Sequence, residues 1–569
     1  MRLIPSPLWR PRLVGAVAAA VILMVGTGTV VQATTSAKSA LSQAPACAPG
    51  TDVQTTTGPV CGIITNGSGL PPPTSPSSGY GVVSGDREWL GIPYAAPPVG
   101  SLRWAPTQPH APWATTLAAT AFGSECTQAN GAGSEDCLYL NVWAPPEGAG
   151  HGLLPVMAHI HGGGFRNGSG NGDNTLLANT GNEVIVSMNY RLGIFGFLAD
   201  SALGPHSGDY GLQDQQAALR WVQDNIAAFG GDPNSVTIYG ESAGGSSVCD
   251  QIASPTAHGL FHKGISTSGE YNTLLGIMPQ VGGTLESQDC KSTLPTQAQA
   301  DSIGAGFAAA VGCGSASDVA ACLRGAPATL IEQAAGLGYQ FGGQGTIAPT
   351  INGTTLTMTL RQALQTGAVN RVPVIAGTDR DENLLGTATT QSDYEQLVGN
   401  QYGNLAPQVL ALYPLSRFYS PFVAWRTVAA DSATVCSSLR TDQDLARWMP
   451  VYGYEIDNGD PPGEVGGVGA ATTPTGAAHV AAWDLTPIAA GLDANMQVLQ
   501  AQEVEGVTTF ARTGNPTALN TPTWPEFKNN GTDSNEMSLA PGGDSQAVSV
   551  GQIGEDHNCG FWDKVMPKP

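Results

Sequence analysis

Positive charge is scarce in this sequence. The 569 residues include 23 Lys and Arg against 45 Asp and Glu, which gives a formal net charge of −22. No cluster of Lys or Arg offsets this negative field, so we expect no nucleic-acid partner. Three motifs are absent as well: the dinucleotide-binding G-x-G-x-x-G, the phosphate-binding G-x-x-x-x-G-K-[ST] and the zinc-binding H-E-x-x-H. We therefore expect no cofactor and no metal site.

A long uncharged apolar run lies at the amino terminus, after three arginines. It covers Leu13–Val31 and ends in Val31-Gln32-Ala33, the small-residue spacing that signal peptidase recognises. Its strongly apolar core is confined to residues 14–25, which favours a cleaved signal peptide over the alternative, a retained membrane anchor. We expect residues 1–33 to be a signal peptide, 34–50 a polar linker and 51–569 one domain, secreted and without stable membrane insertion.

The sequence contains ten cysteines, an even number. In an exported chain they are expected to form disulfides rather than metal sites, because the compartment is oxidising. Two pairs are close in sequence, Cys126 with Cys137 and Cys313 with Cys322, and short loops close easily. The pairing of the other six depends on long-range structure.

Strand-like and helix-like patterns alternate through the middle of the chain. The spacing of five apolar residues before Gly230–Pro233 predicts a helix with one buried face: Leu212, Leu219, Val222, Ile226 and Phe229. Short apolar runs typical of strands buried on both faces of a parallel sheet occur at Val156–His161, Glu183–Asn189, Val236–Tyr239, Val372–Ala376 and Val451–Ile456. This alternation predicts an α/β fold.

A G-x-S-x-G motif, Gly240-Glu-Ser242-Ala-Gly244, follows the strand expected at Val236–Tyr239 and opens a helix. A strand that passes directly into a helix makes a tight turn, and the side chain at its centre projects from the carboxyl edge of the sheet. Glycine is needed on both sides because a Cβ there would collide with neighbouring atoms. Ser242 is therefore the candidate nucleophile.

A serine hydroxyl needs a base to remove its proton, and in this architecture the base is a histidine that follows an acid late in the chain. Four histidines come after the candidate nucleophile: His258, His262, His479 and His557. The first two follow it too closely to leave room for an acid, and the last lies near the chain terminus. His479 lies in a small-residue loop after the expected strand at Val451–Ile456 and is the candidate base.

Three acidic residues are candidates for orienting that histidine. Asp379, Asp381 and Glu382 follow the strand expected at Val372–Ala376, at the sheet edge where such a carboxylate belongs. Their spacing alone does not choose among the three.

A glycine-rich segment, His161-Gly162-Gly163-Gly164-Phe165, directly follows the first of the expected strands. Consecutive glycines let backbone N–H groups converge without side chains in the way, and such donors stabilise the oxyanion that forms when serine attacks a carbonyl. An isolated glycine run is more often a flexible loop. Its pairing with the turn at Ser242 favours the functional interpretation, whereas we interpret His159 and His161 as structural interior histidines.

Together these residues resemble the type B carboxylesterase/lipase family, which includes the cholinesterases. The resemblance extends from about residue 53 to residue 561 and is carried by Leu90–Ala95, Pro97–Trp104, Ser134–Asn141, Asn189-Tyr-Arg191, Phe229–Pro233 and Gly240–Gly245. It implies an α/β-hydrolase fold, in which helices flank a large, mostly parallel central sheet and cap-like insertions lie between the nucleophile and the acid. It also implies a carboxylesterase, a carboxylic-ester hydrolase of class EC 3.1.1.

The resemblance further implies which residues form the site. It implies Glu382 as the acid and supports His479 as the base. Three residues are implied as backbone donors of the oxyanion hole: Gly163, Gly164 and Ala243. Asn383 departs from the family pattern, which usually has glycine after the acid, and this departure leaves Asp381 as the reserve candidate.

Three disulfides are also implied by the resemblance: Cys126 with Cys137, Cys313 with Cys322, and Cys436 with Cys559. The last would tie the tail of the chain to the body of the domain. Four cysteines remain, for which three pairings are open: Cys47, Cys61, Cys249 and Cys290.

The substrate class depends on the loop between Cys126 and Cys137. Thr127–Asp136 contains no aromatic residue, so a choline site of the cholinesterase design, with a tryptophan against the cation, is not expected. Ten residues are too few for a long amphipathic lid, although Asn66–Gly85 or Gly336–Gly345 could supply one. We expect a secreted serine esterase that acts on small short- and medium-chain esters. A triglyceride lipase and a non-catalytic adhesion module are the alternatives.

Overall fold

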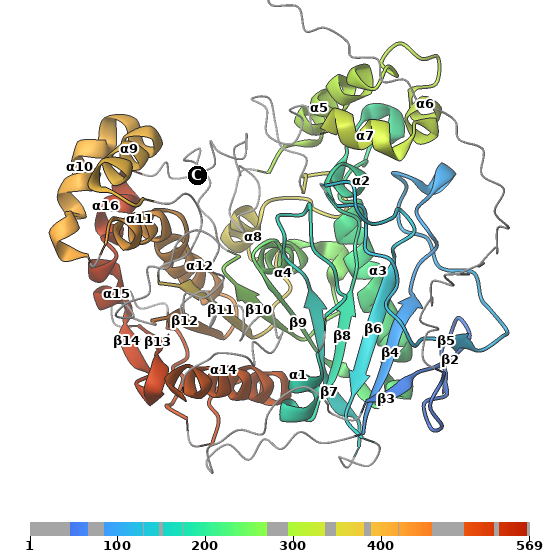
Figure 1. Ribbon diagram of the computed structural model, residues 1–569, viewed down its shortest axis with the longest axis horizontal. Helices are drawn as coiled ribbons and strands as arrows, with labels where there is room; N and C mark the ends of the chain where they lie inside the picture. Colours follow the sequence, from blue (N-terminus) through green and yellow to red (C-terminus); the bar gives the residue numbers. More distant parts are fainter. Residues whose placement is uncertain are drawn as a thin grey trace, which may run out of the picture. The chain divides into compact units, whose positions relative to one another are not determined.

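A large β-sheet forms the centre of the computed structural model (Figure 1). The structure describes residues 46–65, 85–128, 130–146, 152–172, 174–269, 294–335, 349–380, 388–418, 420–457, 494–519, 521–528 and 534–565. Several sequence predictions fall outside these ranges: the signal peptide at 1–33, the possible lids at 66–84 and 336–345, and Asp381, Glu382 and His479. The described residues all belong to one compact unit, Ala44–Pro569.

Within the described residues the sheet has eleven strands, in the order β14-β13-β12-β11-β10-β9-β7-β8-β6-β4-β3. Their bounds are β3 Ile63–Thr65, β4 Asp86–Pro93, β6 Tyr139–Ala144, β7 Leu154–Ile160, β8 Val184–Met188, β9 Gly231–Glu241, β10 Lys263–Thr267, β11 Val374–Asp379, β12 Val451–Ile456, β13 Asn535–Leu539 and β14 Gln546–Ser549. Neighbours from β8 to β13 pair in parallel, and the strands at both edges pair antiparallel. The predicted mostly parallel sheet is confirmed, and the five strands expected from the sequence are β7, β8, β9, β11 and β12.

Helices pack against both faces of this sheet (Figure 1). The α-helices among the described residues are α1 Thr175–Gly181, α2 Gly193–Phe197, α3 Tyr210–Asn225, α4 Ala243–Ala253, α5 Gln297–Ala310, α6 Val319–Gly325, α7 Ala328–Ala334, α8 Leu360–Thr366, α9 Gln391–Tyr402, α10 Ala406–Leu412, α11 Pro421–Ala430, α12 Cys436–Leu445, α14 Ala494–Thr513, α15 Val550–Asp556 and α16 Cys559–Val565. A smaller sheet joins β1 Val53–Gln54, β2 Pro59–Cys61 and β5 Leu117–Ala118.

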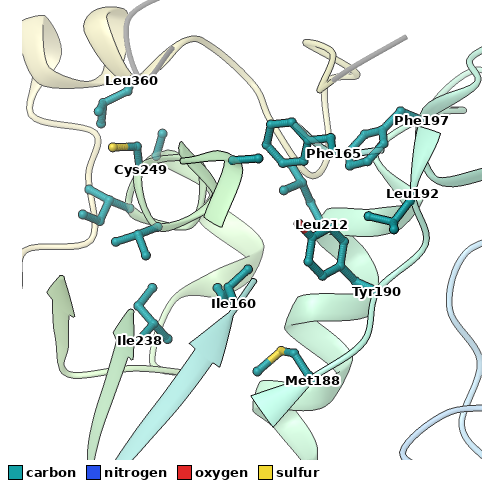
Figure 2. Close-up of a cluster of buried hydrophobic side chains, with 14 of the residues drawn as sticks. Ile160, Phe165, Met188, Tyr190, Leu192, Phe197, Leu212, Ile238, Cys249 and Leu360 are labelled. Carbon is teal, nitrogen blue, oxygen red and sulfur yellow. The ribbon is translucent and has the colours of Figure 1, made fainter. Parts of the chain in front are cut away.

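Side chains of β7 alternate between two hydrophobic cores, one on each face of the sheet. Ala158 and Ile160 pack in the core that includes α3 and α4, whereas Met157 packs in the core that includes α14. Figure 2 shows part of the first core, where Ile160 of β7, Ile238 of β9 and Cys249 of α4 are drawn together. Because both faces are covered, the strand has a mostly apolar sequence, and this is the pattern that predicted a parallel sheet.

The predicted helix before Gly230 is α3, and its apolar face is buried as expected. The α-helix ends at Asn225, and Ile226–Phe229 form a tighter 3₁₀ turn. Gly230 closes that turn with φ 95°, a left-handed conformation that glycine adopts without steric cost. The 3₁₀ turn passes directly into β9. This strand therefore begins at Gly231 and not at Val236, where the sequence pattern predicted its start.

Strand β11 extends further than its sequence pattern indicated. The apolar run ends at Ala376, but β11 continues through Gly377 and Thr378 to Asp379. Backbone pairing with β12 supplies the reason, because the register continues to the pair Asp379 and Ile456. The polar end of the strand is thus held by its neighbour rather than by apolar burial, and Asp379 reaches the carboxyl edge of the sheet.

Helices α5 to α8 lie between β10 and β11, in the part of the chain where the cap-like insertion was expected. The insertion is fastened to the segment Pro97–Trp104 by two arginines that bond to backbone carbonyls in both directions. Arg324 donates to the carbonyl of Arg103 at 2.9 Å, and Arg103 donates to the carbonyl of Ala326 at 2.6 Å. Arg103 also forms a partly buried ion pair with Glu135, at 2.5 Å, in the loop between Cys126 and Cys137.

Four disulfides have both partners among the described residues: Cys47–Cys61, Cys126–Cys137, Cys313–Cys322 and Cys436–Cys559. Three of them are the pairs that the family resemblance implies. Cys249 is also disulfide-bonded, and Cys290 lies outside the described residues. The Cys47–Cys61 bond joins the last residues of the expected linker, 34–50, to strand β2. In the part of the chain that the structure describes, no helix combines the length and the apolar character needed to cross a bilayer.

Candidate active site

Ser242 lies in a strained turn between β9 and α4. Its backbone has φ 55° and ψ −123°, a combination that non-glycine residues rarely adopt and that must be held by its surroundings. The N–H of Ser242 donates to the carbonyl of Thr267 at 2.9 Å, and its carbonyl accepts from the N–H of Ser246 at 2.8 Å. The turn is therefore fixed on both sides, by strand β10 and by the first turn of α4.

Glycine is required at Gly240 and Gly244, as predicted, because the turn packs directly against the end of β7. A Cβ on either residue would collide with the backbone carbonyl oxygen of Ile160. A Cβ on Gly240 would also lie 2.6 Å from the carbonyl carbon of Gly244, far inside normal contact distance. These contacts bring the end of β7, where the glycine-rich segment begins, next to the nucleophile turn.

The glycine-rich segment, defined here as the glycine loop Gly162–Gly168, lies against Ser242. A Cβ on Gly162 would be 3.3 Å from the Cβ of Ser242 and 2.7 Å from the carbonyl oxygen of Glu241. Gly163 and Gly164 have φ 101° and 66°, which side-chain-bearing residues rarely adopt. The glycines are needed both for close approach and for the direction in which the loop turns.

Three backbone N–H groups near Ser242 have no acceptor within the described part of the chain: those of Gly163, Gly164 and Ala243. Ala243 is the first residue of α4, so its N–H has no partner in the helix. Unpaired N–H groups beside a serine can donate to a negatively charged oxygen. The described geometry is compatible with the oxyanion hole that the sequence implies, and the assignment of these three donors stays a prediction.

The two histidines at the end of β7 are buried against tyrosine rings. His159 stacks on Tyr239 with ring centroids 4.9 Å apart, and His161 stacks on Tyr190 at 4.3 Å. Burial lowers the pKa of His159 to about 4 and that of His161 to about 3. Both side chains are therefore neutral near pH 7, so this wall of the site carries no histidine charge.

The strands that precede the candidate acid and base end at the same edge of the sheet as the nucleophile. Asp379 is the buried last residue of β11, and β12 ends at Ile456 beside it. The next residues of both segments are joined by an ion pair between Arg380 and Asp457, with 2.8 Å between nitrogen and oxygen. Glu382 and His479 lie further along, outside the described residues, so their catalytic roles stay predictions.

Ser268 follows β10 at this same edge and is buried. Its N–H donates to the carbonyl of Gly377 at 2.8 Å, and its hydroxyl lies 3.3 Å from the hydroxyl of Thr378. Ser268 therefore connects the end of β10 with the end of β11, the strand that leads to the candidate acid.

The other late histidines occupy different environments. His262 immediately precedes β10, and its Nδ1 accepts from the N–H of Val236 at the opposite end of the strands from Ser242. His258 is exposed, with Nδ1 3.1 Å from the side-chain oxygen of Asn370. His557 is buried between two carboxylates: Nδ1 lies 2.5 Å from Asp431 Oδ1 and Nε2 lies 3.0 Å from Glu455 Oε2. Both ring nitrogens of His557 are thus occupied.

Sequence reasoning assigned no role to the side chains that hold the chain after the glycine loop. Asn189 Oδ1 accepts from the N–H of Gly170 at 2.8 Å, and Asn141 Nδ2 donates to the carbonyl of Gly170 at 3.0 Å. Gln128 makes a comparable pair of bonds to Gly168. Asn141 and Asn189 both occur in segments that carry the family resemblance, which was an available signal, whereas nothing local to Gln128 indicates its contact.

An eleven-stranded α/β sheet with a serine at a strained strand-to-helix turn defines an α/β hydrolase. Residues 80–410 match the model of the Carboxylesterase family. The chain belongs to this family and is a carboxylesterase.

Individual relatives agree with this assignment. The chain is 35% identical over 411 residues to para-nitrobenzyl esterase of Bacillus subtilis (strain 168), a match that covers 66% of this chain and 77% of that protein. It is 36% identical over 357 residues to fumonisin B1 esterase of Sphingopyxis macrogoltabida, covering 58% and 61% of the two chains. A solved structure of PNB esterase superposes with a TM-score of 0.68 at 29% identity, covering 89% of this chain and 99% of the other.

Proposed function

We propose that this carboxylesterase is secreted and hydrolyses soluble short- and medium-chain esters through an acyl-enzyme formed on Ser242. The observation that carries the proposal is the strained turn at Ser242, which lies beside three N–H groups without acceptors in the described structure. A nucleophile and donors for the developing negative charge are the two parts that ester hydrolysis requires at the carbonyl.

The reaction assigns one step to each group. His479 removes the proton of Ser242 as the serine oxygen bonds to the ester carbonyl carbon, and the carbonyl oxygen becomes an oxyanion. The oxyanion accepts hydrogen bonds from the N–H groups of Gly163, Gly164 and Ala243. His479 then gives its proton to the departing alcohol as the carbon–oxygen bond breaks, and water attacks the acyl-enzyme by the same sequence. Glu382 holds the histidine ring and stabilises its protonated form.

The proposed preference for soluble esters rests on the loop between Cys126 and Cys137. Its backbone is folded on itself: the N–H of Gln128 donates to the carbonyl of Ala132 at 2.8 Å, and the N–H of Ser134 donates to that of Glu125 at 2.9 Å. A short loop closed by a disulfide and by these bonds cannot swing as an amphipathic flap. We therefore infer that this loop does not cover the site and open at a lipid surface.

Secretion is supported by the amino-terminal sequence and by the disulfides, because stable disulfides are typical of exported proteins. Expression of the full chain with a downstream tag, followed by amino-terminal sequencing of the protein in the medium, tests this part. A mature protein that begins near residue 34 is expected. A tagged chain retained in the membrane fraction with its amino terminus intact would contradict it.

The substrate class is tested with p-nitrophenyl esters of increasing acyl length, a p-nitrobenzyl ester and an emulsified triglyceride. We expect ordinary saturation with the short and medium esters, and no jump in rate as the triglyceride passes its solubility limit. Ser242→Ala is the matched control, because activity that survives in it does not arise from the proposed site. A sharp rise in rate on emulsification would favour the lipase alternative.

A further inference from the structure

The chain that leaves the glycine loop is held by amide side chains from other segments. Gly170 is bonded by Asn141 and Asn189, two residues after the loop ends. The last residue of the loop, Gly168, is bonded by Gln128, which belongs to the disulfide loop between Cys126 and Cys137. The side chain of Gln128 thus connects the disulfide loop to the glycine loop with a defined geometry.

Gln128 uses both ends of its amide on Gly168. Its Oε1 accepts from the N–H of Gly168 at 2.8 Å, and its Nε2 donates to the carbonyl of Gly168 at 2.9 Å. The same Nε2 also donates to the carbonyl of Cys126 at 2.8 Å. This exchange reproduces the two reciprocal bonds of a hydrogen-bonded residue pair in an antiparallel sheet. Gln128 is only 8% exposed, so water competes little for these bonds.

Gly168 is in direct contact with the start of the glycine loop. Its φ is 100°, and a Cβ there would be 2.5 Å from both the carbonyl oxygen of Gly162 and Nδ1 of His161. Gly162 in turn packs against Ser242 and Glu241. There is no room for a Cβ between Gly168 and Gly162 or between Gly162 and Ser242. Because these segments pack so closely, a shift at Gly168 moves the loop relative to the nucleophile.

The middle of the glycine loop is anchored separately. Phe165 is buried and packs edge-on against Phe197 with ring centroids 5.2 Å apart, and Figure 2 shows the two rings side by side. The carbonyl of Phe165 also accepts from the N–H of Gly193 at 2.6 Å. With Phe165 fixed in the core, the positions of the N–H groups of Gly163 and Gly164 also depend on how the two ends of the loop are held.

We propose that Gln128 is a positioning residue for the oxyanion hole and that the disulfide loop serves as its support. Among the described residues, Gln128 hydrogen-bonds to Cys126 and Gly168, and it acts on the site through Gly168. The Cys126–Cys137 bond and the hydrogen bond from Gln128 Nε2 to the carbonyl of Cys126 keep the amide in place before substrate binds. The inference rests on the proposed function, since it concerns the same three N–H donors.

A transition-state contact that is misplaced lowers the turnover rate more than it weakens substrate binding. Misplacement of about 1 Å can cost about 100-fold in rate, so we expect Gln128→Ala to lower kcat on p-nitrophenyl acetate by about 10- to 100-fold. KM is expected to change by less than about three-fold, because the hole engages the oxyanion and not the ground-state carbonyl. Asn130→Ala is the matched control: it removes a bond within the same loop, to the N–H of Ala132, and kcat should not change.

A trifluoromethyl ketone provides a second measurement, since its adduct with serine places an oxyanion in the hole. Its inhibition constant should rise by the same factor as kcat/KM falls in Gln128→Ala, with no change in Asn130→Ala. Gln128→Met keeps the length of the side chain but loses all three amide bonds, so its kcat should fall as far as in Gln128→Ala. This variant also answers the question if Gln128→Ala does not fold.

The outcomes separate the two levels of inference. Wild-type kcat in folded Gln128→Ala or Gln128→Met would overturn the role of Gln128 and leave the esterase mechanism intact. A loss confined to KM, or an inhibition constant that stays constant while kcat falls, would also overturn it. Undiminished esterase activity in Ser242→Ala would instead refute the proposed function itself.

Discussion

His159 and His161 at the end of β7 and His557 near the carboxyl terminus are all buried, yet only His557 carries a positive charge near pH 7. His159 and His161 face tyrosine rings, and burial lowers the pKa of both. Burial alone would also lower the pKa of His557, but Asp431 and Glu455 raise it well above its ordinary value. Whether a buried histidine is neutral or charged is thus decided by its partners rather than by burial.

The two regions are held together by different forces. Beside Ser242, stability comes from close backbone contact, in which glycines allow the end of β7 and the nucleophile turn to touch. Around His557, polar groups form a buried chain: Trp562 Nε1 donates to the hydroxyl of Tyr413 at 2.7 Å, and that hydroxyl donates to Asp431 at 2.6 Å. The structure around Ser242 is therefore sensitive to added side-chain atoms, and the structure around His557 is sensitive to a change in charge.

This division suits the proposed reaction. An oxyanion beside Ser242 must be stabilised by N–H dipoles that are already oriented, and a fixed charge on His159 or His161 would change the field at the same place. The charged cluster at His557 belongs to the carboxyl-terminal helices, which the Cys436–Cys559 disulfide joins to α12. We therefore predict that substitutions around Ser242 lower the turnover rate, whereas substitutions around His557 lower the free energy of unfolding.

The largest expected effect is the loss of activity in Ser242→Ala. Removal of a serine nucleophile from such a triad lowers kcat by about 10⁶-fold. The change leaves the residues around His557 intact, so the thermal midpoint should stay near that of wild type. Single-turnover hydrolysis of p-nitrophenyl acetate and a thermal melt measure the two quantities. Normal turnover in this variant would end the assignment of Ser242.

The next largest effect is expected from removal of the negative charge on the candidate acid. Glu382→Gln should lower kcat by about 10⁴-fold, because a carboxylate is required to hold the histidine ring and to stabilise its protonated form. Asp381→Asn should be mild, since only one carboxylate can bond to His479. Steady-state kinetics on the two variants compare them directly. The reverse ranking would transfer the acid role to Asp381.

A smaller effect, on stability alone, is expected from His557→Gln. The change leaves Asp431 and Glu455 buried without their cationic partner, which costs about 3–5 kcal/mol of unfolding free energy, while kcat near pH 7 should not change. Denaturant unfolding measures the loss. His258→Gln, at an exposed histidine, is the control and should stay within about 0.5 kcal/mol of wild type.

The pH dependence of the same variant sharpens the comparison. His557 has a raised folded-state pKa, so its stabilisation is present below about pH 6.5, the ordinary histidine pKa, and is lost as pH rises through the folded value. His159 and His161 have lowered values, so their contribution is lost as pH falls below about 6.5. His557→Gln should lose the alkaline decline in thermal midpoint and keep the acid decline. An unchanged alkaline decline would mean that His557 carries no stabilising charge.

Much of the fold was predictable because its signals are local. The five apolar runs correspond to five parallel strands, and the glycines around Ser242 correspond to a turn that only they permit. The extension of β11 to Asp379 was not predictable, because pairing with β12 and not apolarity holds its last residues. The linker prediction likewise could not include the disulfide that joins Cys47 to Cys61, since several pairings were open.

The sequence by itself determined the parts of the site that depend on a few consecutive residues. The turn at Ser242 and the glycine loop are encoded by which positions lack a Cβ, a constraint that is readable without knowing the fold. Only the tertiary structure decided that Gln128 bonds to Gly168, 40 residues away, and that His557 lies between Asp431 and Glu455. The physical reason is that hydrogen bonds and pKa values depend on what packs nearby, and packing follows from the order of the strands and not from neighbours along the chain.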